Sequence, residues 1–98
     1  MKTEVRILVC DLIHEDGVKK LEEAGFTVDV KPEISREELK KAVPNYDALV
    51  VRSRTKVAED VIKEGVRLKA VGRAGVGLDN IDVEAAEKRN IAVFNSPE

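Results

Sequence analysis

Two short stretches carry the residues best suited to bind a small anion. The first, VGRAGVGLDNID from Val71 to Asp82, holds three glycines, Gly72, Gly75 and Gly77. Backbone N–H groups in a glycine turn can point at one ligand and form an anion-binding nest. The second, RSRT from Arg52 to Thr55, carries two guanidinium groups, which bind carboxylate or phosphate through paired hydrogen bonds. Together the stretches predict a site for a small anionic ligand.

The glycine spacing differs from that of a dinucleotide-binding loop. Gly72, Gly75 and Gly77 form the pattern G-x-x-G-x-G. Dinucleotide loops have G-x-G-x-x-G, with an acidic residue about 20 positions further on that binds the ribose. Here the apolar run IAVFN that follows ends in Asn95. A dinucleotide-binding loop therefore does not explain these three glycines.

The elements that must position these stretches alternate regularly along the chain. Five apolar runs predict strands, at Arg6–Cys10, Phe26–Val30, Asp47–Val51, Leu68–Gly72 and Ile91–Phe94. Four segments with helical spacing lie between them, at His14–Gly25, Ile34–Pro44, Ala58–Gly65 and Val83–Asn90. The boundaries carry the expected signals, because Ser35 and Glu38 form a capping box, Gly25 and Gly65 stop helices, and Asp82 starts one.

Strict alternation of strands and helices predicts an α/β domain with a parallel sheet and right-handed crossovers. We expect a flavodoxin-like five-stranded sheet of order 2-1-3-4-5 with helices on both faces, in which ligands bind at the carboxyl ends of the strands. The residues that follow the strands are Asp11, Arg52–Thr55, Gly72–Gly77 and Asn95–Pro97. Arg52, Arg54 and Arg73 should therefore gather at one edge of the sheet, beside the backbone of the glycine turn.

The composition of the chain limits the kinds of partner that such a site can bind. The chain has 98 residues, enough for one domain, and 19 acidic residues against 17 basic ones. This balance gives no overall field that would attract nucleic acid or an anionic membrane, so neither is expected as a partner. A single cysteine, Cys10, excludes an intramolecular disulfide, and no long apolar segment is present, so we expect a cytoplasmic protein. Cys10 ends a buried strand and is interpreted as a core thiol.

Two other binding chemistries of this fold fit the sequence poorly. A cobalamin domain needs D-x-H-x-x-G after the first strand, but Asp11 and His14 are three positions apart, so His14 is interpreted as a helix-start residue. A phosphoacceptor domain needs an Asp after the third strand and a Lys after the fifth. This chain has Arg52 and Asn95 there.

Three stretches resemble the N-terminal part of D-isomer-specific 2-hydroxyacid dehydrogenases. They are ILVCDLIHEDGVKKLEEAG, VVRSRTKV and LKAVGRAGVGLDNIDVEAAEKRNIAVFNSP, and together the resemblance covers the whole chain. It implies that residues 1–98 form the N-terminal substrate-binding domain of an NAD-dependent oxidoreductase whose NAD-binding domain lies outside this chain. It also implies a homo-oligomer, such as a dimer, and an apolar surface or open sheet edge beside the fifth strand.

The resemblance further implies roles for particular residues. Backbone N–H groups of Gly75, Val76 and Gly77 would hold the carboxylate of a 2-hydroxy or 2-oxo acid, and Val76 would also touch the nicotinamide end of NAD. Arg52 and Ser53 would hold the substrate from the opposite wall. Arg54 would favour a substrate that bears a phosphate. The catalytic Arg, Glu and His of the family have no counterpart among these 98 residues.

Two further functions remain open on the sequence. The same residues could serve a stand-alone module that binds a small anion without redox chemistry, or the domain could serve only protein interaction. A reading frame that continues past Glu98 into a helix and a G-x-G-x-x-G unit would favour the dehydrogenase.

Overall fold

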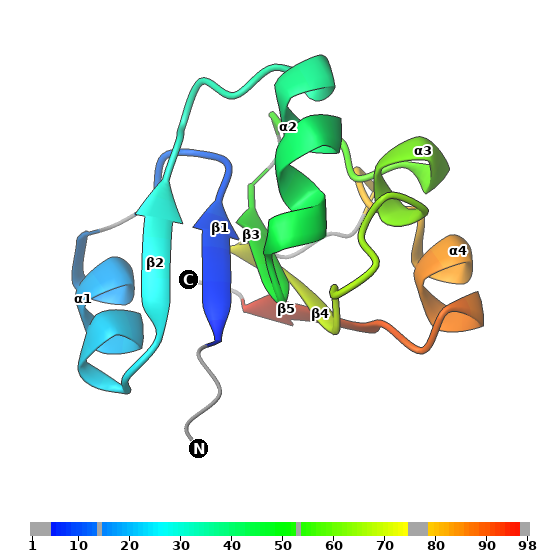
Figure 1. The fold of residues 1–98 in the computed structure, drawn as a ribbon. Coiled ribbons are helices and arrows are strands. Elements are labelled where there is room, and N and C mark those ends of the chain that lie inside the picture. The colour runs from blue at the N-terminus through cyan, green and yellow to red at the C-terminus, as the bar shows by residue number, and fades with distance from the viewer. Residues whose placement is uncertain (1–4, 14, 53, 75–78, 97–98) are drawn as a thin grey trace.

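The computed structural model describes residues 5–13, 15–52, 54–74 and 79–96 of the chain. Its sheet contains five strands, all paired in parallel: β1 (Arg6–Val9), β2 (Thr27–Val30), β3 (Ala48–Val51), β4 (Ala70–Ala74) and β5 (Ala92–Ser96). They lie in the order β2-β1-β3-β4-β5 (Figure 1). The strand order expected from the sequence is confirmed, and each strand begins and ends within two residues of its expected bounds.

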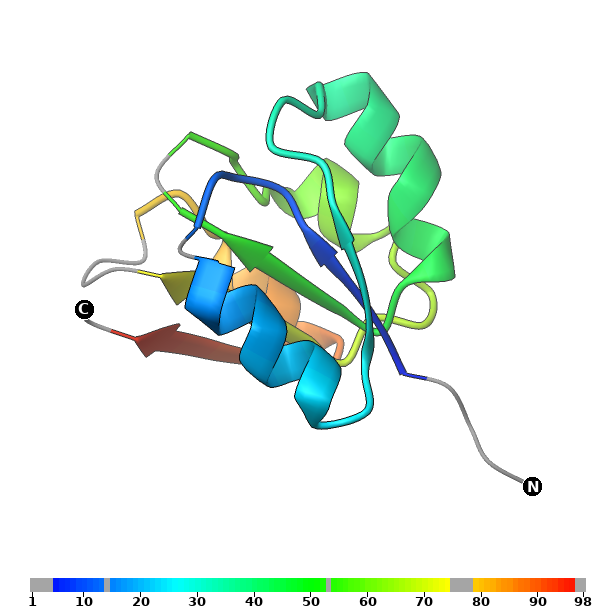
Figure 2. The same ribbon diagram turned by 90° about the vertical axis from the view of Figure 1, so that its left-hand side faces the viewer.

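Helices cover the two faces of this sheet unequally. The four α-helices are α1 (Glu15–Glu23), α2 (Arg36–Ala42), α3 (Glu59–Ile62) and α4 (Val83–Lys88), and a short 3-10 helix, η1 (Val43–Asn45), follows α2. Figure 2 shows α1 in front of the strands, with α2 and the other helices on the far side. Of the described helices, α1 alone covers one face of the sheet.

The helix ends explain the spacing of several polar and glycine residues. The Ser35 hydroxyl accepts from the Glu38 N–H while the Glu38 carboxylate accepts from the Ser35 N–H, which completes the expected capping box of α2. After α1, Gly25 has φ +98°, and the N–H groups of Gly25 and Phe26 donate to carbonyls in the last helical turn. This is the left-handed helix stop that glycine favours.

The expectation for Gly65 needs correction. The third helix ends at Ile62 instead of reaching Gly65, whose φ is not in the left-handed region. A Cβ at position 65 would lie 2.9 Å from the Cβ of Leu68. The glycine is thus required by the close approach of the buried Leu68 side chain, and not by the turn geometry of a helix cap.

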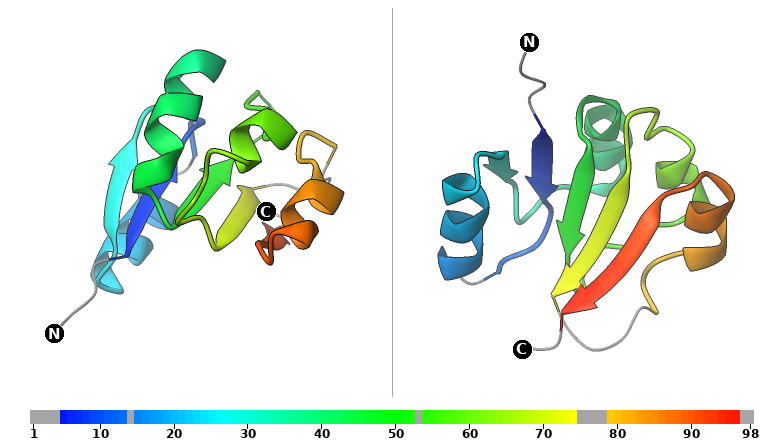
Figure 3. Two further views of the ribbon diagram at one scale, coloured as in Figure 1. Left: turned by 45° about the vertical axis from the view of Figure 1, so that its right-hand side comes forward. Right: turned by 90° about the horizontal axis from the view of Figure 1, so that it is seen from below.

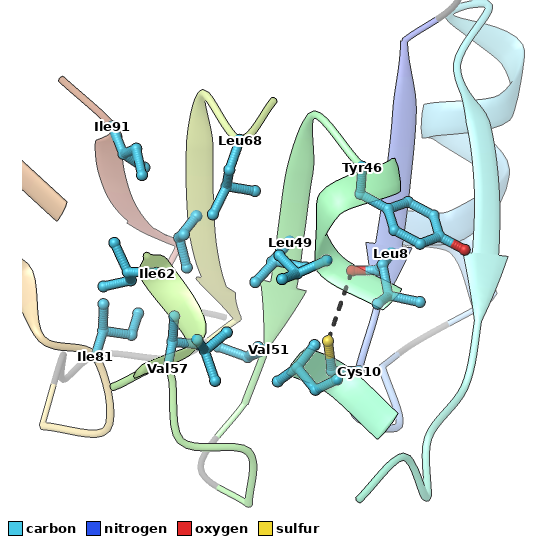
Figure 4. Packing of buried hydrophobic residues seen from close by; sticks show 14 of the residues in the cluster. Leu8, Cys10, Tyr46, Leu49, Val51, Val57, Ile62, Leu68, Ile81 and Ile91 are labelled. Atoms are coloured by element: carbon cyan, nitrogen blue, oxygen red, sulfur yellow. Dashed lines mark hydrogen bonds between the residues drawn. The ribbon is translucent and has the colours of Figure 1, made fainter. Parts of the chain in front are cut away.

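The main core lies between the sheet and helices α2 to α4. Leu8 and Leu49 project from the adjacent strands β1 and β3 into one buried cluster with Ile62 of α3 (Figure 4). Val71, on the next strand β4, belongs to the same cluster. Because side chains alternate along a strand, these residues share one face of the sheet. Val61 and Ile62 are both fully buried, as their spacing in the sequence predicts.

On the opposite face, no described residues outside the sheet cover β4 and β5. The right-hand view of Figure 3 shows these two strands with no described helix in front of them. Phe94, on β5, is 60% exposed, and a Cβ added to Gly72 on β4 would meet nothing within 4 Å. Gly72 pairs with Phe94 across the strands. This arrangement confirms the expected apolar surface beside the fifth strand.

Candidate anion-binding edge of the sheet

The carboxyl ends of β3, β4 and β5 lie side by side, as binding at this edge requires. Val51 pairs with Arg73, and Arg73 pairs with Asn95. Arg52 directly follows Val51, so the end of β3 brings it next to the start of the glycine turn after β4. The structure therefore brings Arg52 and Arg73 to one edge of the sheet, as the sequence predicts.

Arg52 has a fixed backbone and a largely unpaired guanidinium group. Its N–H donates to the Asp11 carboxylate at 2.6 Å. The Arg52 side chain is exposed, and its one described hydrogen bond runs from Nη1 to the Leu12 carbonyl at 3.4 Å, which is a long contact. The guanidinium group is thus available to a ligand at little cost in lost protein contacts.

Arg54 turns toward the body of the domain. Its Nε lies 2.9 Å from the Asp11 carboxylate, and its Nη2 donates to the carbonyls of Cys10 at 2.7 Å and Ile34 at 3.3 Å. These bonds tie the turn after β3 to the end of β1 and to the segment before α2. Two of the three guanidinium nitrogens of Arg54 therefore have a structural role, and its contact with a substrate phosphate stays a prediction.

The buried carboxylate of Asp11 holds the turn after β3 in place. Its side chain is almost completely buried, and it accepts hydrogen bonds from the N–H groups of Arg52 and Thr55 and from the Thr55 hydroxyl. Burial alone would raise the pKa of Asp11, but these hydrogen bonds and the charge of Arg54 outweigh it and hold the pKa below its ordinary value. The carboxylate is therefore ionised in the folded protein at neutral pH.

Asn80 connects the glycine turn to the turn after β3. Its Nδ2 donates to the carbonyl of Arg52 and, at 2.6 Å, to that of Thr55. The backbone continues this connection, because Val57 and Ile81 form a parallel bridge in which the Val57 N–H donates to the Asn80 carbonyl at 2.8 Å. Asn80 was not among the contacts predicted from the sequence.

Arg73 differs from Arg52 in its surroundings. It lies on the same sheet face as buried Val71, and its Nε is buried without a hydrogen-bond partner among the described residues. A buried donor without an acceptor is costly. Arg73 therefore lies at the expected edge, but its Nε is buried, whereas the Arg52 side chain is exposed.

Several predicted contacts fall outside the described residues. They are Ser53, Gly75, Val76 and Gly77, so their predicted roles and the distance from Arg52 to Gly75 stay predictions. His14 also lies outside this part of the chain. Of the described residues that flank the glycine turn, Arg73 pairs with Val51 and Asn80 contacts Arg52, so the flanking residues on both sides lie near Arg52.

Cys10 is a core residue, as expected. It is fully buried, and burial together with the charge of Asp11 raises the pKa of its thiol to about 12. No group of three or more His, Cys, Asp or Glu side chains suited to a metal ion occurs among residues 5–13, 15–52, 54–74 and 79–96. Within the same ranges, no helix has the length and apolar character needed to cross a membrane.

The fold and this edge define an α/β domain with a candidate anion site at the carboxyl ends of its strands. Residues 7–98 match the catalytic domain of D-isomer specific 2-hydroxyacid dehydrogenases, and the chain belongs to this family. Over 94 residues it is 53% identical to a D-3-phosphoglycerate dehydrogenase of Methanocaldococcus jannaschii. It is 41% identical over 92 residues to the human D-3-phosphoglycerate dehydrogenase.

Solved structures agree with this assignment. A protein from Pyrococcus horikoshii superposes with a TM-score of 0.90 at 29% identity, over 96% of this chain and 28% of that one. The NAD+-bound 3-phosphoglycerate dehydrogenase of Entamoeba histolytica superposes with a TM-score of 0.84 at 34% identity, over 97% of this chain and 33% of that one. The match to the M. jannaschii enzyme covers 96% of this chain but 18% of the relative, and that to the human enzyme 94% and 17%.

Proposed function

We propose that this chain is the substrate-binding domain of an NAD-dependent dehydrogenase that acts on 3-phosphoglycerate, in the first step of serine biosynthesis. The observation that carries the proposal is Arg52, an exposed guanidinium group with one long hydrogen bond on a backbone fixed by Asp11 and Asn80. The 53% identity to a D-3-phosphoglycerate dehydrogenase supports the choice of substrate. We place the protein in the cytoplasm, as a homo-oligomer.

In this proposal the chain binds and orients the substrate. Arg52 and Ser53 hold the anionic substrate on one side, and the N–H groups of Gly75, Val76 and Gly77 hold its carboxylate on the other. Charge-assisted hydrogen bonds contribute about 1.5–3 kcal/mol each before ordering costs. The Nη1 of Arg54, for which no partner occurs among the described residues, would add attraction for the phosphate.

The cofactor would be held outside these residues. The glycine turn after β4 lacks the dinucleotide spacing, and the one proposed contact with NAD, at Val76, lies outside the described part of the chain. NAD, when bound, would accept the hydride from C2 of the substrate. The resemblance implies that the family's catalytic histidine has no counterpart among these 98 residues, so we expect the chain to form no NADH on its own.

The test uses the complete reading frame that contains this chain. We expect it to reduce NAD+ with 3-phosphoglycerate and far more slowly with D-lactate or D-glycerate. Arg52→Ala should raise KM for 3-phosphoglycerate about tenfold to a hundredfold, because a charged hydrogen bond is lost. Arg67→Ala, which removes an exposed arginine paired with Asp47, is the matched control and should leave KM unchanged. Equal activity with all three acids would contradict the proposed substrate.

A second candidate is a stand-alone anion-binding module. It is favoured by one observation, that Arg52 and the side chains that fix its backbone all belong to this chain. The two candidates differ in sequence beyond Glu98 and in NADH formation. A reading frame without a G-x-G-x-x-G unit, together with anion binding by this chain, would favour the module.

A further inference from the structure

The turn after β3 is held between two side chains that come from distant parts of the sequence. On one side, the carboxylate of Asp11 accepts from the N–H groups of Arg52 at 2.6 Å and Thr55 at 3.1 Å. On the other side, the Asn80 amide donates to the carbonyls of the same two residues. Both backbone polar groups of Arg52 and of Thr55 are therefore bonded to buried or half-buried side chains.

The surroundings of Asn80 indicate that its donors are the groups required. Its Oδ1 is buried and has no hydrogen-bond partner among the described residues, which is a cost. An amide turned the other way would place that oxygen against two carbonyl oxygens. An aspartate would do the same with a negative charge. Of residues this size, asparagine is the one that can donate to both carbonyls.

These contacts carry an inference that rests on the proposed function. We propose that Asp11 and Asn80 are positioning residues, which hold the Arg52 backbone so that its guanidinium group meets a carboxylate or phosphate at the sheet edge. A site fixed before binding loses less freedom when the ligand arrives.

The first test needs no ligand. Amide hydrogen exchange of Arg52 and Thr55 is measured in the wild-type chain, in Asn80→Ala and in Asn80→Asp. We expect exchange at these two amides to become at least tenfold faster in both variants, while core amides such as Leu49 and Val71 keep their rates. Asn45→Ala, at an exposed asparagine in η1, is the control. Unchanged exchange at Arg52 and Thr55 would overturn the proposal.

The second test asks whether Asn80 acts through Arg52. Binding of 3-phosphoglycerate and of inorganic phosphate is followed by amide shifts in the wild type, Asn80→Ala, Arg52→Ala and the double variant. We expect Asn80→Ala to weaken binding about tenfold in the wild-type background and less than twofold when Arg52 is absent. Equal losses in both backgrounds would overturn the positioning role but leave the proposed function standing. Absence of any wild-type binding would contradict the proposed function and the inference together.

Discussion

At the scale of single residues, the buried carboxylate of Asp11 accepts hydrogen bonds from four donors, all of which belong to the turn after β3. It pairs with the Arg54 guanidinium, accepts the Thr55 hydroxyl and accepts two backbone N–H groups of the turn after β3. An ionised carboxylate buried to this extent is tolerated because every one of these donors compensates it. Asp11 therefore connects the end of β1 to the candidate site without facing the ligand itself.

Asp11→Asn should destabilise the chain. The neutral amide cannot accept from all four donors, and an unmatched buried donor costs about 1–3 kcal/mol. Because the pKa of Asp11 is lowered on folding, its contribution is present above the unfolded value of 3.8 and is lost as the pH falls through the folded pKa. Urea unfolding at pH 7 and at about pH 3 should show a large loss for Asp11→Asn at neutral pH and a smaller one in acid. Asp79→Asn, at an exposed site, should leave the free energy of unfolding unchanged at both pH values. A stability loss for Asp11→Asn that is equal at pH 7 and at about pH 3 would contradict this account.

Cys10 should resist modification in the native protein. Its side chain is fully buried and its thiol pKa is raised to about 12, so almost no thiolate is present or accessible near neutral pH. Iodoacetamide at pH 7.5 should label Cys10 rapidly only after unfolding in guanidinium chloride. Rapid labelling of the folded chain would show that the end of β1 is more open than the structure indicates.

Residue-level prediction from sequence succeeded in part. The end-of-strand rule placed Arg52 and Arg73 at the correct edge because parallel strands share one carboxyl edge. The rule did not predict that Asp11 and Asn80 bind the backbone of Arg52. These two residues lie 41 and 28 positions from Arg52, and no local sequence pattern shows which backbone groups they bind. The rule also did not predict that Arg54 donates to acceptors at the end of β1 and in the segment before α2, because these acceptors are far from Arg54 in sequence.

At the scale of elements, local signals placed the strands and most helices. The strands are short apolar runs that pair in parallel, so their pattern and order could be predicted together. The third helix was overestimated, because Gly65 was interpreted as a helix stop when its role is to admit Leu68. Close packing between residues leaves no local pattern in the sequence, whereas caps such as Ser35 and Glu38 do.

The end of α4 gives a prediction for an element boundary. Asn90 has φ +60°, and the N–H groups of Asn90 and Ile91 donate to Glu87 and Ala86. Asn90→Ala should lower the free energy of unfolding by about 1 kcal/mol, because a Cβ-bearing residue without a polar side chain is disfavoured there. Asn90→Gly should be at least as stable as the wild type, and Asn45→Ala serves as the control. Chemical unfolding followed by circular dichroism measures all three; equal stability of the Ala and Gly variants would contradict the helix-stop assignment.

At the scale of the whole molecule, the domain has one well-covered sheet face and one on which no described residues outside the sheet cover β4 and β5. Phe94 is exposed at the edge strand, and open space lies over Gly72 beside it. Strand β5 as described carries no charged residue and no proline, so it lacks the features that protect edge strands from pairing. This surface should associate with another apolar surface.

Sedimentation should therefore show that the chain self-associates as its concentration rises toward the millimolar range. Phe94→Ser should reduce the association, because it removes the largest exposed apolar side chain on this face. Val66→Ser, at a residue that is 74% exposed elsewhere on the chain, should have little effect. A wild-type chain that stays monomeric over this whole concentration range would contradict self-association through the surface over β4 and β5.

The central claim is that the edge bearing Arg52 binds a small anionic hydroxy acid, and a titration of the labelled 98-residue chain with 3-phosphoglycerate tests it most directly. Amide shifts should concentrate at residues 52–55 and 74–80 with a dissociation constant in the millimolar range, as expected for one or two charge-assisted bonds. Arg52→Ala should weaken binding about tenfold or more, and Arg67→Ala should leave it unchanged. Shifts spread over the surface, or binding that is equally strong without Arg52, would contradict the account.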